Sequence, residues 1–132
     1  MDGFPFACPI QIRWRDLDAF GHVNNATFAT YLETARAELW RERFAGHEAA
    51  DIPFVVARLE IDFKRPIRLY QRVEVGVRVA EVRGSSFTFA YRVEADGGLA
   101  AEASTVQVFV SRDSGRPRRV PDELRGQLLA LG

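Results

Sequence analysis

Two aspartates, a histidine and two asparagines lie within ten positions near the start of the chain. Asp16 and Asp18 come first, and His22, Asn24 and Asn25 follow after a glycine. Both asparagines suit a helix start, because their side-chain oxygens accept hydrogen bonds from its free N–H groups. Those N–H groups and the helix dipole favour developing negative charge. A carboxylate, an imidazole and backbone donors this close together are typical of a site for acyl transfer.

The same residues have structural interpretations. Asp16 and Asp18 could cap turns or pair with Arg13 and Arg15, because aspartate favours turns through local hydrogen bonds. In an extended chain the two aspartates share a face, so they could together bind a metal ion. The sequence offers no further cluster of carboxylates or histidines to complete the ligands of such a metal. A single histidine in a loop, such as His22, could equally be a surface residue that forms hydrogen bonds or a catalytic residue.

Two further groups could contribute to a site. Glu33 and Arg36 lie three residues apart on the predicted helix, where they can form an ion pair, and we expect Glu33 to be partly buried. A basic loop, residues 112–121, contains Arg112, Arg116, Arg118 and Arg119. It is either a solvated turn or a clamp for phosphate, which arginine binds through two parallel hydrogen bonds. On a neutral chain it favours a small phosphorylated ligand over a polymer.

The elements that must position these residues follow from periodicity. After a short lead over residues 1–8, alternation predicts a strand over residues 9–14 that ends in a turn. A helix of about 20 residues is expected to run from the asparagines to a stop at Gly46, with His47 solvated beyond it. Its apolar residues recur at three- and four-residue steps: Phe28, Tyr31, Leu32, Ala35, Leu39, Trp40 and Phe44.

Four more strands are expected after the helix, over residues 55–63, 73–79, 87–93 and 99–111. Val82 falls out of phase, which suggests a bulge or a strand end, and Asp96-Gly97-Gly98 is typical of a hairpin. A short helix is expected over residues 122–131. Consecutive strands with short turns predict an antiparallel meander, which the long helix would cover. The predicted fold class is α+β: a five-stranded antiparallel sheet wrapped around one long central helix, in a single domain over residues 1–132.

Composition restricts the class of protein. The chain has 132 residues, 47% hydrophobic and 27% charged, a globular composition. Eighteen basic and eighteen acidic residues cancel, so no overall field attracts nucleic acid. No signal peptide is evident and no apolar run is long enough to insert into a membrane. The one cysteine, Cys8, fits a packing role and excludes an internal disulfide, so we expect a cytoplasmic location.

Residues 13–36, R-W-x-D-x-D-A-x-G-H-V-N-N-x-x-F-x-x-Y-x-E-x-A-R, closely resemble the signature of hotdog-fold acyl-CoA thioesterases, the 4-hydroxybenzoyl-CoA thioesterase-like family. The H-V-N-N form is similar to general and long-chain acyl-CoA hydrolases and to plant acyl-ACP thioesterases. The K-R-P-I turn after the second strand extends a looser resemblance over nearly the whole chain. The resemblance implies the hotdog fold and hydrolysis of an acyl-CoA without a metal or redox cofactor.

The resemblance also implies roles for residues. Asp18 matches the catalytic nucleophile or general base, Asn25 matches the residue whose backbone N–H polarises the thioester carbonyl, and His22 lies beside them. Residues expected to bind substrate are Gly21, Asn24, Glu33, Arg116, Arg118 and Arg119. A homodimer or a homotetramer is implied, with each site at a subunit interface. The acyl group and its carrier, CoA or acyl carrier protein, stay undetermined.

Two other functions are compatible with the same signature. One is a module that binds an acyl thioester without hydrolysing it, in which the aspartate is structural. The other is a hotdog hydratase or dehydratase, although those relatives use a differently placed Asp/His pair.

Overall fold

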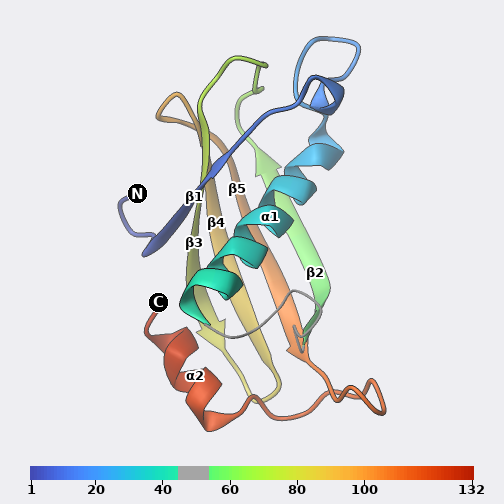
Figure 1. The fold of residues 1–132 in the computed structure, drawn as a ribbon, viewed down its shortest axis with the longest axis vertical. Helices are drawn as coiled ribbons and strands as arrows, with labels where there is room; N and C mark the ends of the chain where they lie inside the picture. The colour runs from blue at the N-terminus through green and yellow to red at the C-terminus, as the bar shows by residue number, and fades with distance from the viewer. Residues whose placement is uncertain (45–53) are drawn as a thin grey trace.

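The computed structural model describes residues 1–44 and 54–132. A five-stranded antiparallel sheet lies against one long helix, α1, and a short second helix lies near the C-terminus (Figure 1). The elements in chain order are β1 (Phe6–Ile10), the 3-10 turn η1 (Trp14–Asp16), α1 (Asn25–Arg43), β2 (Phe54–Phe63), β3 (Val73–Val82), β4 (Ser86–Ala95), β5 (Gly98–Phe109) and α2 (Asp122–Leu129). The predicted α+β class and the five strands are confirmed.

The strand order in the sheet is β1-β3-β4-β5-β2, and every neighbouring pair is antiparallel. β3, β4 and β5 form the predicted meander, with Asp96 and Gly97 in the left-handed region at the hairpin between β4 and β5. The prediction that β2 belongs to the meander is wrong. β2 pairs with β5 at the far edge, and residues 64–72 carry the chain back across the sheet end to β3.

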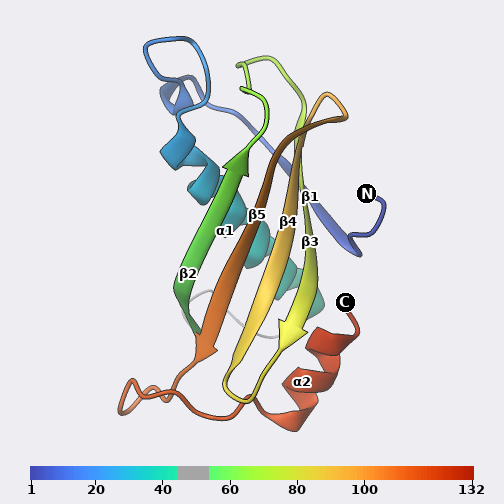
Figure 2. The same cartoon turned by 180° about the vertical axis from the view of Figure 1, so that it is seen from behind.

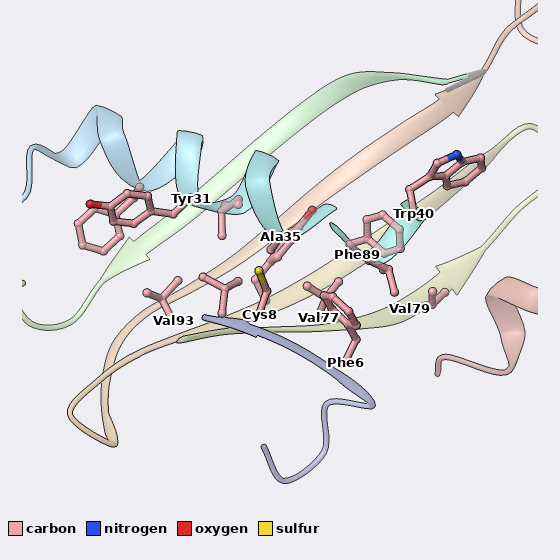
Figure 3. Packing of buried hydrophobic residues seen from close by; sticks show 14 of the residues in the cluster. Phe6, Cys8, Tyr31, Ala35, Trp40, Val77, Val79, Phe89 and Val93 are labelled. Carbon is pink, nitrogen blue, oxygen red and sulfur yellow. The ribbon is translucent and has the colours of Figure 1, made fainter. Parts of the chain in front are cut away.

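The apolar side of α1 packs on one face of the sheet. All seven predicted apolar residues of the helix are buried. Figure 3 shows Ala35 and Trp40 on the side of the helix that faces Val77 and Phe89 of the sheet. Figure 2, from behind, shows the opposite face of the sheet with no helix across it. The helix therefore covers one face only, as predicted, and its start lies beside the end of β2.

The first strand differs from its prediction. β1 begins at Phe6 and ends at Ile10, four residues before the predicted end, and Trp14 is 77% exposed in η1. The turn forms because Asp16 accepts a hydrogen bond from the Arg13 N–H at 3.0 Å, a local bond that competes with strand pairing. Alternation over residues 9–14 therefore predicted the strand and its inward face, but its bounds were wrong.

Other expectations have mixed outcomes. The bulge near Val82 is confirmed, since the register of β3 shifts between Val79 and Glu81. Cys8 is buried in the core, and its burial, followed by the nearby Glu38 carboxylate, raises the pKa of its thiol. Gly46 and His47 lie outside the described residues. No helix in the described ranges is long and apolar enough to cross a membrane.

Candidate active site

The loop between η1 and α1 is held by backbone hydrogen bonds to its neighbours. The Asn24 N–H donates to Asp16 O at 2.8 Å, and the Val23 N–H donates to Ile67 O at 2.8 Å. Ile67 is fully buried, so the turn after β2 anchors the loop that carries Asp18. Two segments more than 40 residues apart in sequence are thereby fixed side by side.

Asp18 sits at the start of a tight turn within this loop. Its Oδ1 accepts from the Phe20 N–H at 2.8 Å and from the His22 N–H at 3.3 Å. Gly21 lies in the left-handed region, with φ 77°, where glycine is favoured because it has no Cβ. These two bonds orient the carboxylate, and no described residue donates to its Oδ2. One oxygen is therefore free for a water molecule or a substrate.

The start of α1 supplies backbone donors next to this carboxylate. Asn24 is the N-cap, and its Oδ1 accepts from the Ala26 N–H at 2.9 Å. Its backbone O accepts from the Thr27 N–H at 2.8 Å. The Asn25 N–H has no acceptor among the described residues, as expected of the first residue of a helix. Asn24 thus accepts hydrogen bonds from the amides of Ala26 and Thr27, and the amide of Asn25 stays available.

A cavity of about 250 Å³ joins these groups. Asp18, His22 and Asn25 line it together with the start of α1 and the end of β2. The further lining residues are Val23, Phe28, Phe63, Lys64, Arg65 and Pro66. The rings of Phe28 and Phe63 meet edge to face at 5.0 Å, so the cavity has apolar walls, an acidic group and two basic side chains.

Asp16 lies apart from this cavity. Its side chain is 3% exposed and accepts from the Tyr31 hydroxyl at 2.8 Å and from Arg13. Burial alone would raise the pKa of Asp16, but the hydrogen bonds from the Arg13 N–H and from Tyr31 outweigh it, so the pKa is lowered. Asp16 and Asp18 line different cavities, which separates the structural carboxylate from the candidate catalytic one and leaves no shared metal site.

The other predicted residues lie outside the cavity lining. Glu33 is exposed on α1 rather than partly buried. Its predicted ion pair with Arg36 is absent from the described residues, because Arg36 donates to the Tyr91 hydroxyl at 3.3 Å instead. The basic loop follows β5, at the opposite end of the sheet from Asp18 (Figure 1). Within one chain, Arg116, Arg118 and Arg119 therefore do not meet the Asp18 cavity.

Sequence reasoning did not place the turn after β2 in the site. Lys64, Arg65 and Pro66 belong to the K-R-P-I segment, which contributed only to the family resemblance. Its spacing along the chain carried no signal of contact with Asp18. In the structure, the hydrogen bond between Val23 and Ile67 and the bridge between His22 and Arg68 bring the two segments together.

Comparison with known proteins identifies the family. The model of the thioesterase-like superfamily matches residues 12–128. The acyl-CoA thioester hydrolase YbgC of Escherichia coli O6:H1 is 29% identical over 123 residues, 90% of this chain and 92% of that protein. The long-chain acyl-CoA thioesterase FadM of E. coli K12 is 28% identical over 123 residues, 90% of this chain and 93% of that protein.

A solved structure agrees with the sequence comparisons. A thioesterase from Thermus thermophilus, crystallised with coenzyme A and zinc, superposes with a TM-score of 0.92 at 40% identity, covering 99% of this chain and 96% of that chain. The predicted hotdog fold is thereby confirmed. Since the family model spans most of its length, the chain belongs to the thioesterase-like superfamily.

Proposed function

We propose that this thioesterase hydrolyses acyl-CoA to a free carboxylic acid and CoA, with Asp18 as general base or nucleophile. The observation that carries the proposal is the single cavity in which the Asp18 carboxylate faces the first residue of α1. The relatives YbgC and FadM, named as acyl-CoA hydrolases, support this choice of substrate.

The geometry suits the reaction in both of its forms. Asp18 Oδ2 either takes a proton from water as the water oxygen bonds to the thioester carbon, or bonds to that carbon itself. In either case the carbonyl oxygen becomes negatively charged, and the free Asn25 N–H at the positive end of the helix dipole stabilises it. The C–S bond then breaks and CoA leaves as a thiolate that takes up a proton. When water attacks, this step releases the free acid directly; when Asp18 attacks, the acyl group stays on Asp18 as a mixed anhydride, which a water molecule then hydrolyses to the free acid and the restored carboxylate.

The remaining predicted residues have supporting roles in this proposal. Gly21 permits the turn that orients Asp18, Asn24 caps the helix, and His22 lies in the cavity wall beside the reacting carbonyl. Phe28 and Phe63 supply an apolar surface for the acyl chain. Glu33 and the basic loop stay as proposed substrate contacts, outside the cavity of a single chain.

We also propose that the working protein is a homodimer or a dimer of such dimers. A cavity of about 250 Å³ is smaller than the roughly 300–1,000 Å³ of complete ligand sites. Beside it, the edge strand β2 exposes apolar side chains, with Val55 53% and Leu59 45% exposed. Exposed apolar edges are sites of strand pairing, so a second copy would complete the site. A cytoplasmic location stays a prediction.

Replacing Asp18 with asparagine tests the mechanism. We expect Asp18→Asn to lower kcat by about 10²–10⁴-fold with an unchanged thermal unfolding curve, because asparagine can still accept both turn hydrogen bonds. The measurement is CoA release from short, long and aromatic acyl-CoAs, with Asp2→Asn on the exposed N-terminal turn as the matched control. Wild-type turnover in Asp18→Asn would contradict the catalytic role of Asp18. If the wild type bound acyl-CoA without hydrolysing it, the protein would instead be a module that binds acyl thioesters.

A further inference from the structure

A short antiparallel ladder joins Asp18 to the start of α1. The Asp18 N–H donates to His22 O at 2.8 Å, and the Asn24 N–H donates to Asp16 O at 2.8 Å. A β-bridge lies between these two bonds. Asp18 is at the turn end of the ladder, and Asn24, the N-cap of the helix, is at the other end. The position of the Asp18 carboxylate relative to the helix therefore depends on how this ladder is held.

The side chain of Asp16 bonds the ladder to the body of the helix. Its carboxylate accepts from the Tyr31 hydroxyl at 2.8 Å, and Tyr31 lies seven residues after Asn24, about two turns into α1. Burial, followed by the bond to Asp16, raises the pKa of Tyr31, so the hydroxyl keeps its proton and donates it to the bond. Asp16 thus contacts the helix twice, at the N-cap through its backbone and at Tyr31 through its carboxylate.

This second contact is strong and lies in the interior. Tyr31 and Asp16 are each 3% exposed, and a hydrogen bond to an ionised carboxylate is stronger inside a protein than in water. The turn after β2 holds one side of the ladder through a backbone bond, while the bond to Tyr31 holds the side next to the helix. Together the two attachments fix the tilt of the ladder against the helix axis.

We propose that Tyr31 and Asp16 are positioning residues for thioester hydrolysis, which hold the Asp18 carboxylate and the Asn25 N–H on the same carbonyl group. The inference rests on the proposed function. Neither Tyr31 nor Asp16 lines the Asp18 cavity, so both act through the ladder and not on the substrate. Because a displacement of about 1 Å can lower a rate about 10²-fold, a small change in the tilt of the ladder should slow the reaction.

Removing the Tyr31 hydroxyl tests this role. We expect Tyr31→Phe to lower kcat by about tenfold to a hundredfold and to leave KM close to that of the wild type, because the residues that line the cavity stay the same. Tyr91→Phe is the matched control. Tyr91 is 2% exposed and its hydroxyl bonds to Thr105 at 2.6 Å, but it does not line the Asp18 cavity. It should lose a similar amount of stability and keep the wild-type kcat.

Two substitutions of Asp16 separate its bond to Tyr31 from its charge. Asp16→Asn keeps an oxygen that accepts from the Tyr31 hydroxyl, so at a temperature where the variant is folded its kcat should stay within a few-fold of the wild type. Asp16→Ala removes the acceptor and should lower kcat as much as Tyr31→Phe does. Combining Asp16→Ala with Tyr31→Phe should lower kcat no further, because both changes remove the same bond. If Asp16→Ala does not fold, Tyr31→Phe and Asp16→Asn still make the comparison.

An Asp18→Asn background tests whether Tyr31 acts through Asp18. Once the carboxylate is absent, a change in its position has no further effect. We therefore expect Tyr31→Phe to lower the kcat of Asp18→Asn by much less than it lowers that of the wild type, since residues that act as a unit have non-additive effects.

Each other result contradicts a definite part of the proposal. A wild-type kcat in Tyr31→Phe, equal losses of kcat in Tyr31→Phe and Tyr91→Phe, or a full loss in the Asp18→Asn background would overturn the positioning role. A raised KM with an unchanged kcat would do the same. The proposed function fails separately, if the wild type hydrolyses no acyl-CoA or if Asp18→Asn alone keeps wild-type turnover.

Discussion

Asp16 and Asp18 are two residues apart, yet their carboxylates serve different parts of the molecule. Asp16 is buried and bonded to Tyr31 of α1, so it ties η1 to the helix. The Asp18 carboxylate accepts hydrogen bonds from described residues through one oxygen only, from the turn that follows it. The same residue type therefore stabilises the loop at one position and faces the cavity at the other.

The proposed role of Asn25 depends on its backbone N–H and not on its side chain. Asn25→Ala keeps this donor and should change kcat by no more than a few-fold. Asn25→Pro removes it and should lower kcat by about 10²–10³-fold, as for other oxyanion donors. Proline suits the first helical position, and the preceding Asn24, at φ −58° and ψ 136°, has a backbone compatible with it.

Steady-state kinetics with a thermal unfolding curve for each variant makes this comparison. An unchanged kcat in Asn25→Pro would remove the helix amide from the mechanism. Equal losses in both variants would assign the role to the asparagine side chain.

The lowered pKa of Asp16 predicts a pH-dependent contribution to stability. In the folded chain Asp16 loses its proton more readily than at its ordinary pKa of 3.8. The ionised group therefore stabilises the fold above pH 3.8, and this stabilisation is lost as the pH falls through the folded pKa. We expect Asp16→Asn to lower the free energy of unfolding by about 1–3 kcal/mol at pH 7, and by less near pH 3.

Urea unfolding at the two pH values measures the difference. Asp2→Asn, at an exposed position of the N-terminal turn, should change stability little at either pH. A loss for Asp16→Asn that is as large at pH 3 as at pH 7 would show that the ionised form is not what stabilises the fold.

At the scale of the element, β2 differs from the other strands in what covers it. β3 and β4 have their inward residues buried under α1, whereas β2 leaves Val56, Leu59 and Phe63 at least 43% exposed. A bulge between Val56 and Arg58 also places Val55 on the face opposite Leu59, so the exposed apolar side chains of this strand do not all share one face. An edge of this kind is stabilised by pairing with another chain.

The proposed homodimer, formed by antiparallel pairing of β2 with a second copy of itself, predicts the effect of a charge swap. With the two-fold axis at Leu59, Arg58 of each copy lies opposite Glu60 of the other. Glu60→Arg sets arginines opposite each other twice in the dimer and should raise its Kd at least about tenfold. The double variant Arg58→Glu/Glu60→Arg restores opposite charges and should return the Kd close to that of the wild type. Sedimentation at several protein concentrations measures both values. Equal Kd values for the single and double variants would contradict the register centred on Leu59.

At the scale of the whole molecule, the Asp18 cavity and the basic loop lie at opposite ends of the sheet (Figure 1). Within one chain the loop therefore does not meet the cavity. For a chain of 14.9 kDa, the proposed homodimer predicts a working particle of twice this mass.

The sequence by itself determined the features that depend on near neighbours. Helical spacing identified the buried side of α1, Asp96-Gly97-Gly98 located a hairpin, and the capping preference of the two asparagines located the helix start. These three features follow from contacts within a few residues, which local preferences describe well. The signature over residues 13–36 indicated the family and singled out Asp18 by resemblance.

Only the tertiary structure decided which distant segments meet. It placed β2 at the sheet edge, brought Lys64 and Arg65 beside Asp18, and buried Asp16 against Tyr31. Strand alternation is the same whichever neighbour a strand pairs with, so it does not encode sheet order. The spacing of Asp16 and Asp18 alone gave no reason for their different surroundings; the packing of η1 against α1 directs Asp16 into the fold, while Asp18 lines the cavity.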